Sequence, residues 1–144
     1  MPPCDVPVAG FDHVAITVAD VDATVAWYER VLDAEPLHYD LWLAGKLPIA
    51  LLQVGASRLS VHPAEAPAAP HADAPTPGSA DLCFRYDGPV AEILARLAAE
   101  GVTVVEGPVP RPASSGEPGA SVYFRDPDGN LLELLTTDAA PAAG

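Results

Sequence analysis

Four side chains of metal-ligand type alternate with apolar residues in this chain. His13 and His62 lie in its first half, and Asp81 and Glu133 lie in its second half. Successive side chains of a strand point to opposite faces, so all four would leave the face that packs on the core. Two imidazoles and two carboxylates suit one divalent cation (Zn, Ni, Co, Mn or Fe), which would offset the cost of burying the carboxylates. We therefore predict a site for one divalent metal ion, with positions left open for water or substrate.

Further side chains could contact a substrate beside this predicted metal site. Tyr123 alternates with large apolar neighbours, so its hydroxyl would point to the same side as the predicted ligands. Arg58 and Arg85 lie an even number of residues from the predicted ligands His62 and Asp81 on the same strands, so their side chains would point to the same face as those ligands. Both arginines would suit an anionic substrate. Trp42 is another candidate for substrate contact. Core packing of Tyr123 and solvated positions for both arginines remain the structural alternatives.

The elements that must position these residues form two similar halves. In the first, residues 11–18 alternate as a half-buried strand does, and Asp20 is placed to cap a helix over 21–32. Three strands are then predicted, at roughly 35–43, 47–54 and 57–62.

The second half repeats this plan. Residues 80–86 are predicted as a strand, and a helix follows from Pro89 to its end at Gly101. The sequence Asp126-Pro-Asp-Gly-Asn130 predicts a tight turn between two strands. The three strands of this half are expected at about 102–106, 120–125 and 130–136.

Proline marks the expected boundaries of a single domain over residues 9–137. Residues 63–78 form a Pro/Ala-rich linker between modules at about 9–62 and 79–137. We expect disordered tails at 1–8 and 138–144.

The composition excludes several classes of partner. The chain has 144 residues, with 20 acidic and 7 basic side chains, and its formal net charge is -13. Such a chain repels nucleic acid and anionic membrane surfaces. It has neither a membrane-spanning apolar run nor the start of a signal peptide, so we expect a cytoplasmic protein with a small-molecule substrate. Cys4 and Cys83 are expected to be free thiols.

Three segments together resemble the vicinal oxygen chelate superfamily, which includes glyoxalase I, methylmalonyl-CoA epimerase, extradiol dioxygenases, fosfomycin-resistance enzymes and bleomycin-binding proteins. They are Phe11-Asp-His-Val-Ala-Ile-Thr-Val18, Trp27-Tyr-Glu-Arg-Val-Leu32 and Val122-Tyr-Phe-Arg-Asp-Pro-Asp-Gly-Asn-Leu-Leu-Glu-Leu134. Residues 58–62 and 75–84 look most like the branch of glyoxalase domain-containing and virulence proteins. The resemblance implies an α+β fold in which paired βαβββ modules form a curved mixed sheet around a metal-binding cleft.

The resemblance also implies roles for individual residues. His13, His62 and Glu133 match the family's metal positions on the first, fourth and eighth strands. Asp81 departs from the pattern, because glyoxalase-like members commonly place histidine at that fifth-strand position and a carboxylate on the fourth strand. Asp81 is therefore either a ligand or the acceptor of a hydrogen bond from a ligand histidine. Arg111 matches an arginine of the related branch and joins the predicted substrate-binding residues.

These residues predict a metal-dependent enzyme that acts on a small oxygen-rich metabolite. The leading hypothesis is glyoxalase-like isomerase, lyase or epimerase chemistry through a metal-stabilised enediolate, with Glu133 as the catalytic residue that moves the proton. The first alternative is an Fe(II)-dependent extradiol-type dioxygenase, and the second is a non-catalytic resistance protein that binds a drug or metabolite. We expect a homodimer, in which the linker allows modules to be exchanged between chains.

Overall fold

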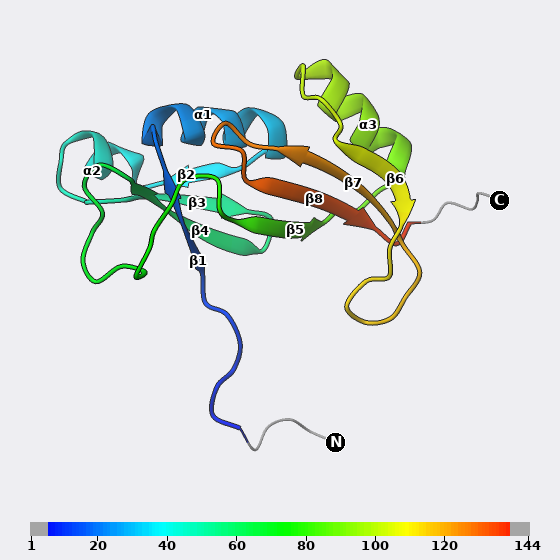
Figure 1. The fold of residues 1–144 in the computed structure, drawn as a ribbon, viewed down its shortest axis with the longest axis horizontal. Helices are drawn as coiled ribbons and strands as arrows, with labels where there is room; N and C mark the ends of the chain where they lie inside the picture. The colour runs from blue at the N-terminus through cyan, green and yellow to red at the C-terminus, as the bar shows by residue number, and fades with distance from the viewer. Residues whose placement is uncertain (1–5, 139–144) are drawn as a thin grey trace.

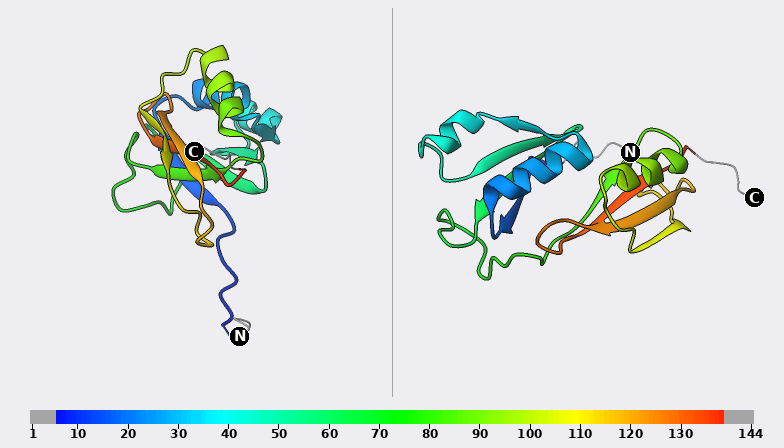
Figure 2. Two further views of the ribbon diagram at one scale, coloured as in Figure 1. Left: turned by 90° about the vertical axis from the view of Figure 1, so that its right-hand side faces the viewer. Right: turned by 90° about the horizontal axis from the view of Figure 1, so that it is seen from above.

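Two four-stranded sheets lie side by side in the computed structural model, which describes residues 6–138 (Figures 1 and 2). The strands are β1 (Val14–Val18), β2 (Glu35–Leu37), β3 (Ala50–Val54), β4 (Ser57–Pro63), β5 (Asp81–Arg85), β6 (Glu106–Pro110), β7 (Ala120–Arg125) and β8 (Leu131–Thr136). The sheet orders are β1-β4-β3-β2 and β5-β8-β7-β6. In each sheet an outer strand, β1 or β5, pairs in parallel with β4 or β8, and the other pairs are antiparallel.

The helices cover the same side of both sheets (Figures 1 and 2). Helix α1 (Val21–Leu32) begins at Asp20, whose side chain accepts a hydrogen bond from the Ala23 amide at 2.9 Å. Helix α3 (Val90–Ala99) buries Ile93 and Leu97 against the second sheet. We call the opposite sides the helix-free faces, and we call the β1–β4 and β5–β8 halves the first and second modules. The predicted α+β fold class is confirmed: each module has four strands, with α1 and a second, short helix (Tyr39–Leu43) in the first module and α3 in the second.

Four predicted strands differ in their bounds by three residues or more. Strands β1 and β3 begin at Val14 and Ala50, three residues after the starts predicted at 11 and 47. The strand expected at 35–43 stops at Leu37, because His38 adopts a left-handed φ of 52° and the chain then forms the short helix α2 (Tyr39–Leu43). The strand expected at 102–106 begins only at Glu106 and runs to Pro110. It lies at the edge of its sheet, where proline's missing N–H costs no ladder bond.

The segment between β4 and β5 contains no helix or strand over 64–80. It nevertheless packs closely on the second module. Gly78 has a φ of +83°, and a Cβ at this position would lie 2.6 Å from the carbonyl oxygen of Asp128. The segment therefore needs glycine where it crosses the turn between β7 and β8. The tails expected at 1–8 and 138–144 lie mostly outside the described residues, as does Cys4.

A buried hydrogen-bond network at the β7–β8 turn joins the two modules. The Tyr28 hydroxyl of α1 donates to Asp126 Oδ2 at 2.7 Å, and Asn130 Nδ2 donates to the same oxygen at 2.8 Å. Asp126 Oδ1 accepts from the backbone amides of Asp128 and Asn130. Asn130 Oδ1 in turn accepts from the Ala80 amide at 2.9 Å, just before β5. Burial and the neighbouring Asp126 charge raise the pKa of Tyr28, so its hydroxyl stays protonated and able to donate.

Apolar and ionic contacts extend this joint along the helical side. Trp27 packs on Phe124 with a centroid separation of 6.3 Å, so one hydrophobic core spans both modules. At the other end of α1, Arg96 of α3 donates to the Val31 carbonyl and to the Asp33 carboxylate. None of the helices among the described residues is long and apolar enough to cross a membrane.

The joint predicts a specific loss of stability. We expect Tyr28→Phe to lower the free energy of unfolding by about 1.5–3 kcal/mol, because a buried carboxylate loses one of its donors. Urea unfolding followed by circular dichroism measures this change. Tyr39→Phe is the matched control, since the Tyr39 hydroxyl also donates to a carboxylate, Asp22, but at an exposed position. An equal decrease in unfolding free energy in both variants would contradict the claim that burial makes the Tyr28–Asp126 hydrogen bond more stabilising than an exposed one.

Candidate functional site

The helix-free faces carry all the predicted metal ligands that lie within strands. On β4, Leu59 and Val61 are buried under the helices, while His62 alternates with them. On β8, Leu132 and Leu134 are buried and Glu133 alternates with them. The parity argument from the sequence therefore places these side chains on the correct side of each sheet.

The two histidines belong to the first sheet. His13 directly precedes β1, is exposed, and its Nδ1 lies 2.8 Å from Asp12 Oδ1. His62 is half-buried on β4 and pairs in register with Thr17. Burial, with smaller effects from His13 and His71, lowers the pKa of His62, so its imidazole is neutral near pH 7. A neutral imidazole is the form that can bind a metal ion.

The two carboxylates belong to the second sheet. Asp81 begins β5 and is exposed, whereas Glu133 lies half-buried in the middle of β8. Cys83 of β5 and Tyr123 of β7 stand directly beside Glu133 on the two neighbouring strands. Ser121 Oγ donates to Glu133 Oε2 at 2.5 Å and fixes the orientation of this carboxylate.

The register corrects the expected symmetry between the modules. Cys83, two residues after Asp81, pairs with Glu133, while Ala15, two residues after His13, pairs with Ser60. The counterpart of Glu133 in the first module is therefore the buried Ser60. His62 lies two residues further along β4, so the four predicted ligands are not related by the repeat.

Within residues 6–138 of one chain, no three His, Cys, Asp or Glu side chains come together in a group that could hold a metal ion. The four predicted ligands instead form two pairs, with two imidazoles on the first sheet and two carboxylates on the second. The donor types suit a divalent cation, but a single chain does not assemble them into one site.

The predicted substrate-binding residues occupy different surroundings. Arg111 Nε donates to the Tyr123 hydroxyl at 3.0 Å, and its guanidinium carbon lies 5.6 Å from the centroid of the Tyr123 ring. Arg58 bonds Gln53 on the neighbouring strand, and Arg85 bonds Thr137. Trp42 lies on α2, on the helical side, where its indole donates to Asp22 at 2.9 Å. Its contact with a substrate stays a prediction, and the structure shows a packing role for this side chain.

Sequence reasoning missed two features of this region. Ser121 is buried and orients Glu133. It lies two residues before Tyr123 on the same strand, so the sequence could have placed its side chain on the same face as Tyr123. His71, which the sequence indicated only as a surface residue, lies near enough to His62 to affect its pKa. No strand or helix pattern runs through the segment that carries His71, so its position could not be read from periodicity.

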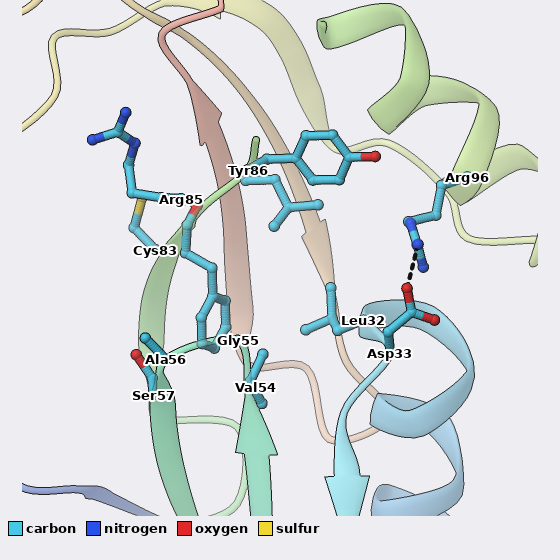
Figure 3. Close-up of a pocket in the computed structure, with 12 residues that line it drawn as sticks. Leu32, Asp33, Val54, Gly55, Ala56, Ser57, Cys83, Arg85, Tyr86 and Arg96 are labelled. Atoms are coloured by element: carbon cyan, nitrogen blue, oxygen red, sulfur yellow. Dashed lines mark hydrogen bonds and ion pairs between the residues drawn. The ribbon is translucent and has the colours of Figure 1, made fainter. Parts of the chain in front are cut away.

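A cavity of about 420 Å³ opens between the modules (Figure 3). Its walls come from the end of α1, the β3–β4 turn, β5 and α3, and the Arg96–Asp33 ion pair spans one side. None of the four predicted metal ligands lines it. The lining residues are Leu32, Asp33, Val54, Gly55, Ala56, Ser57, Cys83, Phe84, Arg85, Tyr86, Arg96 and Leu134.

The sequence between residues 10 and 134 matches the family model of the Glyoxalase/Bleomycin resistance protein/Dioxygenase superfamily. The chain belongs to this superfamily. Virulence protein STM3117 of Salmonella typhimurium is 39% identical over 123 residues, which cover 85% of this chain and 81% of that protein. Glyoxalase domain-containing protein RDO1 of Mycosarcoma maydis is 38% identical over 127 residues, covering 88% and 68% respectively.

Solved structures of the superfamily share the fold. The crystal structure of STM3117 aligns with a TM-score of 0.81 at 35% identity, covering 91% of this chain and 98% of that chain. Lactoylglutathione lyase from Agrobacterium tumefaciens aligns with a TM-score of 0.65 at 25% identity, covering 91% and 96%. The predicted membership of the superfamily, and the likeness to its glyoxalase domain-containing and virulence-protein branch, are confirmed.

Cys83 provides a test of the surroundings of Glu133. Cys83 is an exposed residue, but partial desolvation of its thiol, the charge and hydrogen bond of Glu133, and the charge of Asp81 raise the pKa of the thiol to about 12. The thiol therefore stays protonated below this pH, and its thiolate is scarce at pH 8. We expect iodoacetamide to alkylate Cys83 in the metal-free protein roughly a thousandfold more slowly than an ordinary cysteine.

Peptide mass spectrometry over a range of pH measures the alkylation at Cys83 alone. Glu133→Gln removes one negative charge and should speed the reaction, whereas Glu65→Gln, in the linker, should not. Rapid alkylation of Cys83 in the native protein at pH 8 would contradict the raised pKa that we give to this thiol.

Proposed function

We propose that this protein is a divalent-metal-dependent enzyme that acts on a small oxygen-rich metabolite, with glyoxalase-like isomerase or lyase, or epimerase, chemistry. The observation that carries the proposal is the placement of His62, Asp81 and Glu133 on the helix-free faces, with His13 directly before β1. This donor set suits Zn, Ni, Co, Mn or Fe(II), and such an ion, when bound, acts as a Lewis acid on substrate oxygens.

Glu133 is the residue that we propose moves a proton. Its carboxylate is half-buried, and the Ser121 hydroxyl holds Oε2 at 2.5 Å. Tyr123 stands beside it on the next strand. A carboxylate fixed in this way presents its remaining lone pairs to a substrate on the helix-free face without first having to reorient.

A second copy of the chain would complete the site. The strands that carry or adjoin His13 and Asp81, β1 and β5, are both at the edge of their sheets and have an unpaired side. Residues 6–13 project away from the sheets, and Val8 and Phe11 on this arm are 80% and 93% exposed (Figure 1). We propose a homodimer in which the histidine pair of one chain faces the carboxylate pair of its partner, and which covers this apolar arm.

One observation favours a second candidate function. Asp81 is exposed and makes no side-chain hydrogen bond to residues 6–138, whereas Ser121 anchors Glu133. A set of His13, His62 and Glu133 alone would be the two-His, one-carboxylate arrangement of non-haem Fe(II) oxygenases. The alternative is therefore an Fe(II)-dependent dioxygenase of the extradiol type.

Metal binding tests the proposal directly. We expect purified protein to bind about one divalent ion per chain, and Glu133→Gln to weaken the affinity by at least about tenfold. Isothermal titration with Zn, Ni, Co and Mn measures both quantities, and Glu29→Gln, at an exposed position of α1 on the helical side, is a charge-matched control. Anaerobic loading with Fe(II), followed by oxygen uptake with catechols, separates the dioxygenase alternative. A protein with no affinity for any of these ions would contradict the proposal.

Mixed dimers test whether two chains share each site. Dimers of His13→Ala chains alone, or of Glu133→Gln chains alone, should bind metal at least about tenfold more weakly than the wild type. A dimer of one chain of each kind, isolated with two affinity tags, should regain one intact site, because the unaltered histidine pair of one chain meets the unaltered carboxylate pair of the other. Metal content near half of the wild-type value is the expected result. Mixed dimers without metal, or a monomer in sedimentation, would contradict the shared site.

A further inference from the structure

Five of the seven basic side chains of this acidic chain fall into two groups. Of the other two, Lys46 lies in an exposed loop, and Arg125 Nη1 donates to the Gly129 carbonyl at 3.1 Å. Arg30 and Arg96, on the helices, form ion pairs with Glu100 and Asp33 at 2.9 and 2.5 Å. The arginines on the helix-free faces instead direct their side-chain hydrogen bonds to neutral groups: Arg58 to Gln53, Arg85 to Thr137, and Arg111 to Tyr123 and the Pro110 carbonyl. Within residues 6–138 the nearest carboxylate to any of these three is Glu106, 3.7 Å from Arg111 Nη2. Arg111 thus has one long, exposed ion pair with Glu106, and within residues 6–138 Arg58 and Arg85 form none.

Arg111 is held in place while most of its donors stay free. A guanidinium has five N–H donors. One of them, on Nε, donates to the Tyr123 hydroxyl at 3.0 Å, and one on Nη1 donates to the Pro110 carbonyl at 2.9 Å. Glu106 lies beyond hydrogen-bond distance of Nη2. The Nη1–Nη2 end thus keeps donors for a bidentate acceptor, and the contact with Tyr123 has already restricted the side chain.

The register places this guanidinium beside the proposed proton carrier. Tyr123, which binds Arg111, pairs directly with Glu133 across β7 and β8. On the other side of β8, Cys83 of β5 pairs with Glu133. Arg85 is two residues after Cys83 on the same strand, so its side chain points to the same face. Glu133 therefore lies between two arginines on one helix-free face. A carboxylate that acts on a substrate would have cations on both sides to hold a negatively charged part of that substrate.

We infer that Arg111, positioned by Tyr123, binds an oxyanion group of the substrate, a carboxylate or a phosphonate, with Arg85 as the second cation. The inference rests on the proposed function, because it names the class of molecule that this site accepts. It also gives Tyr123 a definite part as a positioning residue, since its hydroxyl accepts from Arg111 Nε and its ring packs under the guanidinium.

Small anions test the inference without metal or turnover. Metal-free protein, labelled with ¹⁵N, would be titrated with lactate, methylphosphonate and the neutral control glycerol at constant ionic strength. We expect the Arg111 Nε–H resonance and the Tyr123 amide to shift with one or both anions and not with glycerol. The anion that binds more tightly distinguishes a carboxylate from a phosphonate substrate. Shifts of equal size with glycerol would overturn the inference.

Matched variants assign the binding to these side chains. Arg111→Ala should weaken the anion by at least about tenfold, as for loss of a charge-assisted bidentate contact, and Arg85→Ala should weaken it less. Lys46→Ala removes the same charge from an exposed loop and should leave the affinity within about twofold. Tyr123→Phe keeps the charge of Arg111 but removes its anchor, so we expect an intermediate loss. Unchanged affinity in Arg111→Ala would overturn the inference even if that variant is fully folded.

The two proposals fail in different ways. Metal uptake that depends on Glu133, with no anion binding that depends on Arg111, would overturn the oxyanion site and leave the metal-dependent enzyme in place. Anion binding that depends on Arg111, with no affinity for any divalent ion, would support the oxyanion site and overturn the metalloenzyme.

Discussion

The arrangement of the two sheets depends on how the buried carboxylate of Asp126 is satisfied. A carboxylate removed from water is costly unless donors replace its hydration. Here the turn itself supplies the Asp128 and Asn130 amides, and Tyr28 of the other module supplies its hydroxyl. The turn can therefore be buried only when α1 stands over it. The same contact that lowers the cost of burying Asp126 fixes the second module against the first, and the Trp27–Phe124 packing follows from it.

This joint lies on the helical side and leaves the opposite faces free for chemistry. The buried apolar residues of each strand point toward the helices, so the alternate positions collect the polar side chains. The first module contributes the His62 imidazole there, with His13 directly before β1, and the second contributes carboxylates with arginines beside them. Neither module holds enough donors for a metal ion by itself. The proposed chemistry thus requires the histidines of one chain to meet the carboxylates of another. The unpaired edges of β1 and β5 are where a second chain would bind to bring them together.

Local patterns predicted most of the fold because local rules govern it. Alternation placed β4 and β8 correctly, and the cap at Asp20 began α1 where the sequence predicted. The errors arose where a backbone torsion or an edge position decided the outcome. Nothing in the alternation of residues 35–43 predicts a left-handed φ at His38, and β6 tolerates its prolines only because it is an edge strand.

The candidate site was less accessible to sequence reasoning, because register and association are not local. The alternation of side chains assigned His62 and Glu133 to the helix-free faces. Ser60 and His62 point to the same face, so alternation cannot tell which of them is the counterpart of Glu133. Only the pairing of β1 with β4 makes that distinction. The approach of His71 to His62 likewise depends on the path of a segment without regular structure.

The joint lies close to the predicted carboxylates, because Asp81 directly follows Ala80 and Glu133 is three residues after Asn130. Three residues of a strand span roughly 10 Å, so a tilt of about 5° about the joint moves Glu133 by about 0.9 Å. Displacements of about 1 Å are enough to change a reaction rate by roughly a hundredfold. The Trp27–Phe124 packing on the helical side would therefore adjust the separation of the groups proposed to react. Substitutions behind the sheets would then change the proposed chemistry even if every residue on the helix-free faces stayed the same.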